Sequence, residues 1–464
     1  MKKKAVSVFL AVCLAVLLLP FQVFALQDSG DNGSAAGAQN FTPGETITGS
    51  ISEDGDLDFY RFTLSESGRV SLDFTSYMEY YALYLYDTAG NELFITENNQ
   101  WNETMGYRQD AYTVDLEAGT YFIRVSGYQY SWSGTSATGN YSLQTGFTAS
   151  GANEQEPNNS AAAANTMSFG STARGLIGLN DNYDFYRIDL SESGRLTLDI
   201  TVHMEYYALY LYDHMGSTLW STNNNYWNET MGLRQDVHTI DLEAGTYYLE
   251  VSGYQYDWSS NYATGTYAIA PTFTASGANQ PEPNDSAAQA VQVSTESMIT
   301  GLIARNDAYD FYTFTLSANE TLPLQVTSYM EYYSVYIYNP AGEEVWSTTG
   351  NYWNETVGSR SDAYEISLDA GTYYLRISGH QYSWSSEYAT GVYNLSFGAV
   401  RGDVDGNGRV DIQDVMATCK ILARSNAGET PTATELQRGD MNGNGAIAID
   451  DVMAICKLLA QGAR

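Results

Sequence analysis

Hydrophobic and polar residues alternate with a period of two in short stretches along most of the chain. The alternation is clear at residues 69–74 (RVSLDF) and at residues 81–86 (YALYLY). It is typical of half-buried strands, and glycine-bearing turns such as Ser67-Gly68 and Ala89-Gly90 separate these stretches. Short strands at regular spacing, with few helix formers between them, predict a mainly β protein of antiparallel, jelly-roll-like β-sandwiches.

The chain contains three copies of this strand pattern. Asp58-Phe59-Tyr60 returns at Asp184 and again at Asp310, 126 residues further on each time. A unit of more than 100 residues is a domain rather than a solenoid repeat. We therefore expect a linker at residues 26–40 and a first sandwich at 41–148. A second sandwich with its linker follows at 149–274, a third at 275–398, and a different module at 399–464.

The last module changes to helical spacing. Two acidic loops, Asp403 to Asp414 and Asp440 to Asp451, lie 37 residues apart, and an apolar run at helical spacing follows each. Oxygen-bearing side chains at positions 1, 3, 5 and 12, with Gly at 6, suit a hard cation with six to eight oxygen ligands. Position 7 offers a backbone carbonyl, and position 9 usually holds a water. One such turn is common on solvated surfaces, but two in register predict calcium. The predicted ligands are Asp403, Asp405, Asn407, Asp411, Asp414, Asp440, Asn442, Asn444 and Asp451, with Arg409 and Ala446 through their carbonyls.

This duplicated loop-helix unit has no entering helix and ends each loop in Asp. In these features it resembles a type I dockerin over residues 402–459. The resemblance implies a small all-α domain of two F-hand repeats, calcium as cofactor and a cohesin domain as partner. The second loop departs from the pattern because Ala448 stands at position 9, where the first loop has Asp411.

Lysine usage supports a partner surface. Beyond the first four residues the chain has only Lys420 and Lys457, at the same position of the two repeats. A solvated lysine near a helix end is the simpler explanation, but two at symmetry-related positions favour a contact, and in dockerins this position touches the cohesin. The predicted partner residues are Ile412, Gln413, Cys419, Lys420, Ile449, Asp450, Cys456 and Lys457.

The first 25 residues are typical of a signal peptide. Three lysines precede an apolar run to Phe24, and Val23-Phe24-Ala25 offers a cleavage site. We expect a secreted protein, extracellular or attached to a cell surface through the cohesin, with no membrane span. Only Cys419 and Cys456 remain after cleavage, so a disulfide scaffold is excluded, although a bond between these two stays open. A net charge of −34 excludes nucleic acid as a natural partner.

The second and third sandwiches open in the same way. Glu156-Pro157-Asn158 and Glu282-Pro283-Asn284 each precede a Gly-Leu-Ile strand and an Asp-x-x-Asp-Phe-Tyr motif. The sandwiches thereby resemble the bacterial pre-peptidase C-terminal domain, and the resemblance implies a calcium site. The alternative is a simple turn capped by Asp. The first copy has Gly55 in place of one Asp and is not expected to bind metal. The implied ligands are Glu154, Glu156, Asn158, Asn159, Asp181 and Asp184, then Glu282, Asn284, Asp285, Asp307 and Asp310.

The chain has no recognisable catalytic motif. His203, His238 and His380 each stand where the other copies have tyrosine, which argues against proton transfer. Glutamates such as Glu79 and Glu103 recur in all three units, and identical catalytic pairs in three small sandwiches would be unusual. We therefore expect that the protein is not an enzyme.

Tyrosine is abundant, with 39 residues. On one strand Tyr81, Leu83 and Leu85 are expected in the core, and the neighbouring tyrosines on the opposite face. Exposed rigid rings suit sugar or protein ligands, but they can equally pack against each other or against a neighbouring unit. The candidate ligand-binding residues are Tyr80, Tyr84, Tyr128, Tyr130 and Trp132.

These observations predict a secreted, non-catalytic modular protein. Its dockerin would attach it to a cohesin on a scaffold or cell surface, and its sandwiches would bind carbohydrate or protein or act as spacers. An accessory or divergent hydrolase of extracellular polysaccharide degradation, as in a cellulosome, is the alternative. The ligand of the sandwiches, the particular cohesin and the oligomeric state are left open by the sequence.

Overall fold

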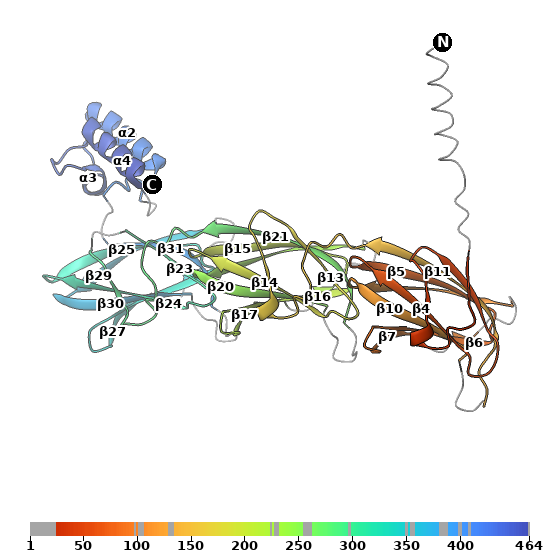
Figure 1. Ribbon diagram of the computed structural model, residues 1–464. Helices are drawn as coiled ribbons and strands as arrows, with labels where there is room; N and C mark the ends of the chain where they lie inside the picture. The colour runs from red at the N-terminus through yellow and green to blue at the C-terminus, as the bar shows by residue number, and fades with distance from the viewer. Residues whose placement is uncertain are drawn as a thin grey trace, which may run out of the picture.

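The computed structural model describes residues 25–96, 99–100, 106–128, 134–222, 225–226, 232–253, 262–295, 298–348, 351–352, 358–379, 388–397, 401–406 and 410–462. Three β-sandwiches lie in a row, and a helical module follows the third (Figure 1). The predicted fold class is confirmed. The predicted signal peptide lies outside the described residues except for Ala25.

The first sandwich consists of two sheets that cover one core. One sheet has the order β1 (Leu26–Gln27), β3 (Thr46–Ile51), β11 (Gly139–Ala149), β5 (Gly68–Ser76), β9 (Arg108–Leu116). The other has the order β2 (Gln39–Asn40), β4 (Leu57–Leu64), β10 (Gly119–Ser126), β6 (Tyr80–Tyr86), β7 (Glu92–Ile95), with β8 (Asn99–Gln100) also paired to β6. A short 3-10 helix, η1 (Ala35–Gly37), precedes β2.

The second sandwich repeats this plan. One sheet has the order β13 (Ala173–Ile177), β21 (Gly265–Ala275), β15 (Gly194–Val202), β19 (Arg234–Leu242). The other has the order β12 (Asn165–Thr166), β14 (Tyr183–Leu190), β20 (Gly245–Ser252), β16 (Tyr206–Tyr212), β17 (Thr218–Ser221), with β18 (Asn225–Tyr226) on β16. The 3-10 helix here is η2 (Ala161–Ala163).

The third sandwich has the same strands again. One sheet has the order β23 (Met298–Ile303), β31 (Gly391–Phe397), β25 (Glu320–Ser328), β29 (Arg360–Leu368). The other has the order β22 (Val291–Gln292), β24 (Tyr309–Leu316), β30 (Gly371–Ser378), β26 (Tyr332–Tyr338), β27 (Glu344–Ser347), with β28 (Asn351–Tyr352) on β26.

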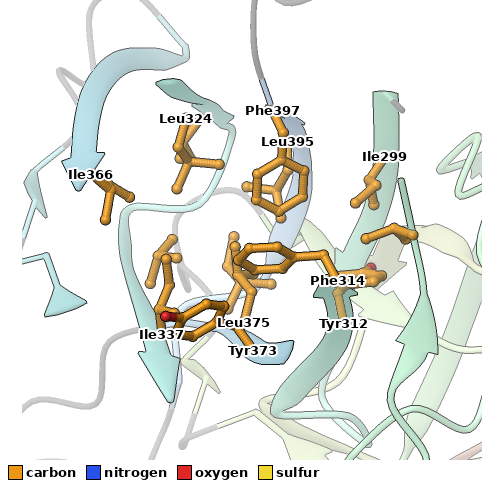
Figure 2. Close-up of a cluster of buried hydrophobic side chains, with 14 of the residues drawn as sticks. Ile299, Tyr312, Phe314, Leu324, Ile337, Ile366, Tyr373, Leu375, Leu395 and Phe397 are labelled. Carbon is orange, nitrogen blue, oxygen red and sulfur yellow. The ribbon is translucent and has the colours of Figure 1, made fainter. Parts of the chain in front are cut away.

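The alternating pattern places one face of each strand in the core. Along β5 every second residue from Gly68 onward is buried, and Tyr81, Leu83 and Leu85 of β6 point inward as predicted. In the third sandwich, Phe314 and Phe397 pack with their ring centroids 4.9 Å apart. Figure 2 shows these rings between the aliphatic side chains of both sheets. Each sandwich therefore has its own apolar core.

Residues 26–40, predicted to be a linker, are part of the first sandwich. Leu26 and Gln27 pair in parallel with β3, and Gln39 and Asn40 pair in parallel with β4. The prediction was wrong because this segment is too short and too polar to show alternation, although the Leu26 side chain packs against the core.

A glycine in the opening strand of each sandwich makes room for a buried tyrosine. A Cβ on Gly175 would lie 2.2 Å from the Tyr267 hydroxyl oxygen and 2.4 Å from Glu154 Oε2. A Cβ on Gly49 would overlap Tyr141 in the same way, and a Cβ on Gly301 would overlap Tyr393. Since only hydrogen fits there, the glycine of the Gly-Leu-Ile strand is a packing requirement of the site described below.

The C-terminal module is helical. Its helices are α2 (Ile412–Asn426), α3 (Ala433–Gly439) and α4 (Ile449–Gly462). Val404, Ile421, Ile447 and Ile455 form its small core. Arg424, on α2, forms an ion pair with Glu435 of α3.

Among the described residues, none of the helices combines the length and the apolar character that a membrane span requires.

Candidate functional site

The first acidic loop closes on its last residue, Asp414. Asp414 Oδ1 accepts hydrogen bonds from the backbone N–H of Val404 (2.7 Å) and Asp405 (3.1 Å), and Oδ2 accepts one from Asp411 N (2.7 Å). One carboxylate oxygen each of Asp403, Asp405 and Asp414 lies within 4.8 Å of the other two. The structure thus brings together the predicted ligands at positions 1, 3 and 12. Asn407 and Arg409 lie outside the described residues.

The second loop has the same closure. Asp451 Oδ1 accepts from Met441 N (2.9 Å) and Oδ2 from Ala448 N (2.8 Å). Asp440 accepts from the N–H groups of Gly443 (2.7 Å) and Gly445 (2.6 Å). The predicted ligands Asn442, Asn444 and Ala446 are exposed in the same loop, and Asn444 Oδ1 accepts from Ala446 N at 2.9 Å.

The two loops differ at position 9. In the first loop Asp411 caps α2, and its side chain accepts from Gln413 N at 2.6 Å. Ala448 has no side-chain acceptor and cannot cap α4 in this way. The first loop therefore couples its metal-ligand residues to the start of its helix more tightly than the second.

The donor set fits calcium. Asp403, Asp414 and Asp451 have no exposed surface, and Asp440 is 6% exposed. Burial raises the pKa of Asp414, although backbone N–H groups oppose this shift. Several carboxylates held together at low exposure, with amide and carbonyl oxygens beside them, match the oxygen-rich coordination of this cation.

The two long helices carry equivalent exposed surfaces. We call the exposed side chains of α2 the α2 face and those of α4 the α4 face. On the α2 face Ile412 is 61% exposed and Met416 50%, and on the α4 face Ile449 is 63% exposed and Met453 67%. All the other predicted partner residues are exposed on the same helices, namely Gln413, Cys419, Lys420, Asp450, Cys456 and Lys457.

Met416 and Met453 were not among the predicted partner residues. Of the apolar run after each loop, Ile421 on α2 and Val452 and Ile455 on α4 are buried. The signal that could have found the methionines is their spacing, four residues after Ile412 and Ile449. Both cysteines are free and exposed, so the structure shows no bond between them.

The second sandwich holds the implied carboxylate cluster at its opening. Glu154, Glu156 and Asp184 each offer an oxygen within 4.8 Å of the others. Asp184 has no exposed surface, and Tyr267 lies 2.6 Å from its Oδ2. Asp181 joins the group through a hydrogen bond from the Asn159 amide. Asn158 is fully buried, and its backbone N–H bonds to Glu156 at 2.9 Å.

The carboxylates of this cluster raise one another's pKa values. Burial, then the charge of Asp181, raises the pKa of Glu156 to about 7. Burial likewise raises the pKa of Asp181 to about 6. Such shifts express the cost of holding like charges together in a site shielded from water, and a bound cation would remove this cost.

The third sandwich has a similar set. Glu282, Asp285 and Asp307 lie within the same mutual distance, 4.8 Å. Asp310 and Asn284 are fully buried beside them. Burial, followed by the charge of Asp310, raises the pKa of Asp307 to about 10. Gln280 replaces Glu154 here and Asp285 replaces Asn159, so both sites have four carboxylates.

The first sandwich retains part of this arrangement. Asn32 O accepts from Phe59 N at 2.9 Å, as Asn158 and Asn284 do from Phe185 and Phe311. Asp58 is buried, and burial raises its pKa to about 6. Asp28 and Asn32 therefore correspond to Glu154 and Asn158. Gly55 leaves the set without its second Asp, in line with the expectation for this unit.

The tyrosines on the outer face of the sheet stack on one another. Tyr84 and Tyr86 stack with centroids 6.0 Å apart, and the Arg124 guanidinium lies 3.6 Å from the Tyr84 ring centre. Glu250 replaces Arg124 in the second sandwich and accepts from Tyr212 at 2.8 Å. Tyr128 N donates to Tyr80 O, while Tyr130 and Trp132 lie outside the described residues. A ligand-binding role for these residues stays a prediction.

His238 replaces a tyrosine in structure as well as in sequence. Its Nε2 lies 3.1 Å from the Tyr207 hydroxyl, where Tyr112 and Tyr364 contact Tyr81 and Tyr333. Burial lowers the pKa of His238. His203 is exposed and contacts Gly232 O at 3.0 Å. His380 lies outside the described residues.

Comparison with known families identifies the last module. Residues 401–460 match the type I dockerin domain, as predicted. No curated protein sequence matches the chain.

Solved structures resemble the sandwiches. The pre-peptidase C-terminal domain of a collagenase from Bacillus anthracis is 19% identical, with a TM-score of 0.18, over 26% of this chain and 98% of that domain. A family 35 carbohydrate binding module from Clostridium thermocellum is 15% identical, with a TM-score of 0.14, over 26% of this chain and 87% of the module. A periplasmic inhibitor of g-type lysozyme from Salmonella Typhimurium is 15% identical, with a TM-score of 0.15, over 24% of this chain and all of the inhibitor. The first of these is the predicted resemblance.

Proposed function

We propose that this chain is a secreted, non-catalytic modular protein that binds a cohesin through its C-terminal dockerin domain in a calcium-dependent manner. The cohesin would belong to a scaffold or cell-surface protein. The three sandwiches would then present a carbohydrate- or protein-binding surface, or hold such a surface away from the anchor.

The observation that carries this proposal is the pair of exposed faces on the dockerin helices. Each face has an isoleucine and a methionine that are at least half exposed, beside a cysteine and a lysine. Large apolar side chains gathered on a small solvated domain are typical of a surface that a partner covers. The lysine adds a charge that an acidic group of the partner can pair with.

Calcium would act through the start of each long helix. Asp414 and Asp451 lie in the first turns of α2 and α4, and each also closes its loop through backbone hydrogen bonds. With a cation bound, the loop carboxylates hold these turns in place. Without it, their mutual repulsion opposes a core of four buried residues. Loss of calcium should therefore disorganise both faces at once.

A non-catalytic role for the sandwiches is supported by the interchange of His238 with Tyr112 and Tyr364 in one hydrogen-bonded position. A residue that a tyrosine can replace in the neighbouring copy contributes packing and a hydrogen bond, and such a position offers no proton relay.

The test is a pull-down of the full mature chain, residues 26–464, on a panel of immobilised type I cohesins in calcium and in EGTA. Capture by at least one cohesin in calcium, lost in EGTA, is the expected result. A variant with Met416→Asp and Met453→Asp should not be captured, whereas Met215→Asp, which changes an exposed methionine of the second sandwich, should behave as the parent. Hydrolysis of polysaccharide by the full chain would contradict the non-catalytic part.

A further inference from the structure

The first and second sandwiches are joined at Asp115, the penultimate residue of β9. Its backbone carbonyl accepts from Leu179 N of the second sandwich at 2.9 Å. Its carboxylate accepts two hydrogen bonds from Arg69 (2.8 and 2.9 Å) and one from Thr264 of the second sandwich (2.9 Å). Asp115 is only 4% exposed. This residue therefore belongs to a packed junction between domains.

The second junction uses the equivalent residues. Asp241 O accepts from Arg305 N at 2.9 Å, and its carboxylate accepts from Arg195 and from Thr390. In the third sandwich, which no sandwich follows in this chain, the corresponding pair is Thr321 and Ser367, whose hydroxyls lie 3.0 Å apart. The Arg–Asp pair thus occurs in the two sandwiches that have a following neighbour.

Glu117 follows Asp115 by two residues and reaches the same junction. Its backbone lies against the turn that carries Asp181, since a Cβ on Gly178 would lie 3.3 Å from Asp115 O and 3.5 Å from Glu117 N. Asp181 N bonds to Gly178 O within this turn. β9 and β13 are in contact at this point. The backbone of Glu117 is thereby placed beside the turn that carries Asp181, and the negative charges of Asp181, Glu154 and Glu156 act on its carboxyl group.

Four buried oxygens at this junction accept no hydrogen bond from any residue that the structure describes. They are Glu117 Oε1, Asn158 Oδ1, Asp181 Oδ2 and Asp184 Oδ1. Asn158, Asp181 and Asp184 are each at least 97% buried. Unpartnered buried acceptors are costly, and a cluster of them from two domains is what a cation site presents before the ion binds. Burial, followed by the charges of Asp181, Glu154 and Glu156, raises the pKa of Glu117 to about 9.

We propose that a divalent cation with the oxygen preference of calcium binds between the first two sandwiches, with Glu117 of the first as a ligand beside Asn158, Asp181 and Asp184 of the second. The site is then shared and not confined to one domain. Its occupation fixes the angle between neighbours, because a cation bonded to both domains resists their separation. This inference concerns the sandwiches alone and does not depend on the dockerin.

The second junction has a weaker version of this site. Glu243 corresponds to Glu117, and burial, followed by the charges of Asp310 and Asp285, raises its pKa to about 7. Asp307 Oδ2 and Asp310 Oδ1 are buried without a partner among the described residues. Gln280 takes the place of the half-buried Glu154, and the carboxylate gained at Asp285 is exposed. Water screens an exposed charge, so the affinity for a cation should be lower.

The experiment is calorimetric titration of calcium chloride into the full mature chain in which the dockerin loops are disabled by Asp403→Asn, Asp414→Asn, Asp440→Asn and Asp451→Asn. We expect residual calcium binding, and Glu117→Gln should weaken its tighter component about tenfold or more, because it removes one charged ligand. Asp369→Asn is the matched control: Asp369 occupies the same position in the third sandwich, where it accepts from Asn319 at 2.7 Å. It should leave calcium binding unchanged.

A second readout follows the angle between domains. Spin labels at Asp73→Cys and Asp199→Cys, both exposed positions, are placed in a chain with Cys419→Ser and Cys456→Ser. Calcium should narrow the distribution of label distances in the parent and leave it broad in Glu117→Gln. Unchanged calcium affinity in Glu117→Gln would overturn the proposal and assign the site to the second sandwich alone. Absence of residual binding, or equal weakening by Asp369→Asn, would overturn it as well.

Discussion

The hydroxyl of Thr264 donates a hydrogen bond of 2.9 Å to the carboxylate of Asp115, and this contact joins two domains through residues 149 positions apart. The same carboxylate forms an ion pair with Arg69 of its own sandwich. One acidic residue therefore stabilises both the end of its strand and the neighbouring domain, and the third sandwich shows what takes its place when no sandwich follows.

Replacing Arg69 and Asp115 by Thr and Ser, the pair found at Thr321 and Ser367, should uncouple the first two sandwiches without unfolding either. Asp115→Ala alone should cost about 1–2 kcal/mol, because it leaves Thr264 without its acceptor while water partly compensates Arg69. Scanning calorimetry of the full chain measures the coupling of the two sandwiches in the double variant and the loss of stability in Asp115→Ala. Identical unfolding of the parent and the double variant would show that the junction carries no coupling.

Gly175→Ala should destabilise the second sandwich by about 1–3 kcal/mol, because the added Cβ would overlap Tyr267 and Glu154. Gly178→Ala is the matched control. Its Cβ would meet only ordinary or slightly tight contacts, and the third sandwich already has Ala304 at this position. Thermal unfolding of both variants decides the point, and equal effects would contradict the packing described here.

The second sandwich should lose stability in mild acid through His238. Its pKa is lowered by burial in the folded state, against about 6.5 in the unfolded chain. Above that value the imidazole is neutral in both states. Below it the unfolded state takes up a proton first, so the free energy of unfolding falls as the pH drops toward the folded pKa.

His238→Tyr, the residue present at this position in both other sandwiches, should remove this dependence. Denaturant unfolding of the parent and the variant between pH 7 and pH 5 measures it. If the two proteins lose the same stability over this range, another group is responsible.

Either the α2 face or the α4 face should be able to bind the cohesin. Lys420→Ala or Lys457→Ala alone should cost little cohesin affinity, because the other face still binds. The double variant should cost more than the sum of the two, by on the order of 2 kcal/mol if each lysine makes a charge-assisted contact. Calorimetry with a captured cohesin measures all three. Complete loss of binding in one single variant, with no change in the other, would assign recognition to one face.

Much of the fold could be predicted from sequence because the three copies are in register. Alternation of apolar and polar residues identified the strands and the inward position of Tyr81, and the resemblance to the pre-peptidase C-terminal domain implied the carboxylates around Asp184. Residues 26–40 were misassigned because Asp28-Ser-Gly-Asp-Asn does not resemble the Glu-Pro-Asn entry of the other copies, although Asn32 makes the same backbone contact as Asn158.

The junction could not be predicted in the same way, since a comparison of copies aligns equivalent residues and says nothing of contacts between successive units. A signal was nevertheless present. Arg69 and Arg195 become Thr321 in the last copy, and Glu117 and Glu243 become Asp369. On the dockerin, Met416 and Met453 were not predicted as partner residues, because helical spacing alone does not say which apolar side chains a small domain leaves exposed.

The central claim is that calcium organises a dockerin surface for cohesin binding, and one titration tests it most directly. A cohesin captured by the full mature chain is titrated by calorimetry into the parent in calcium, the parent in EGTA, and the Asp414→Asn, Asp451→Asn double variant in calcium. The account predicts binding at one cohesin per chain in the first case and an affinity lower by about 100-fold or more in the other two. Equal affinity in all three would contradict it.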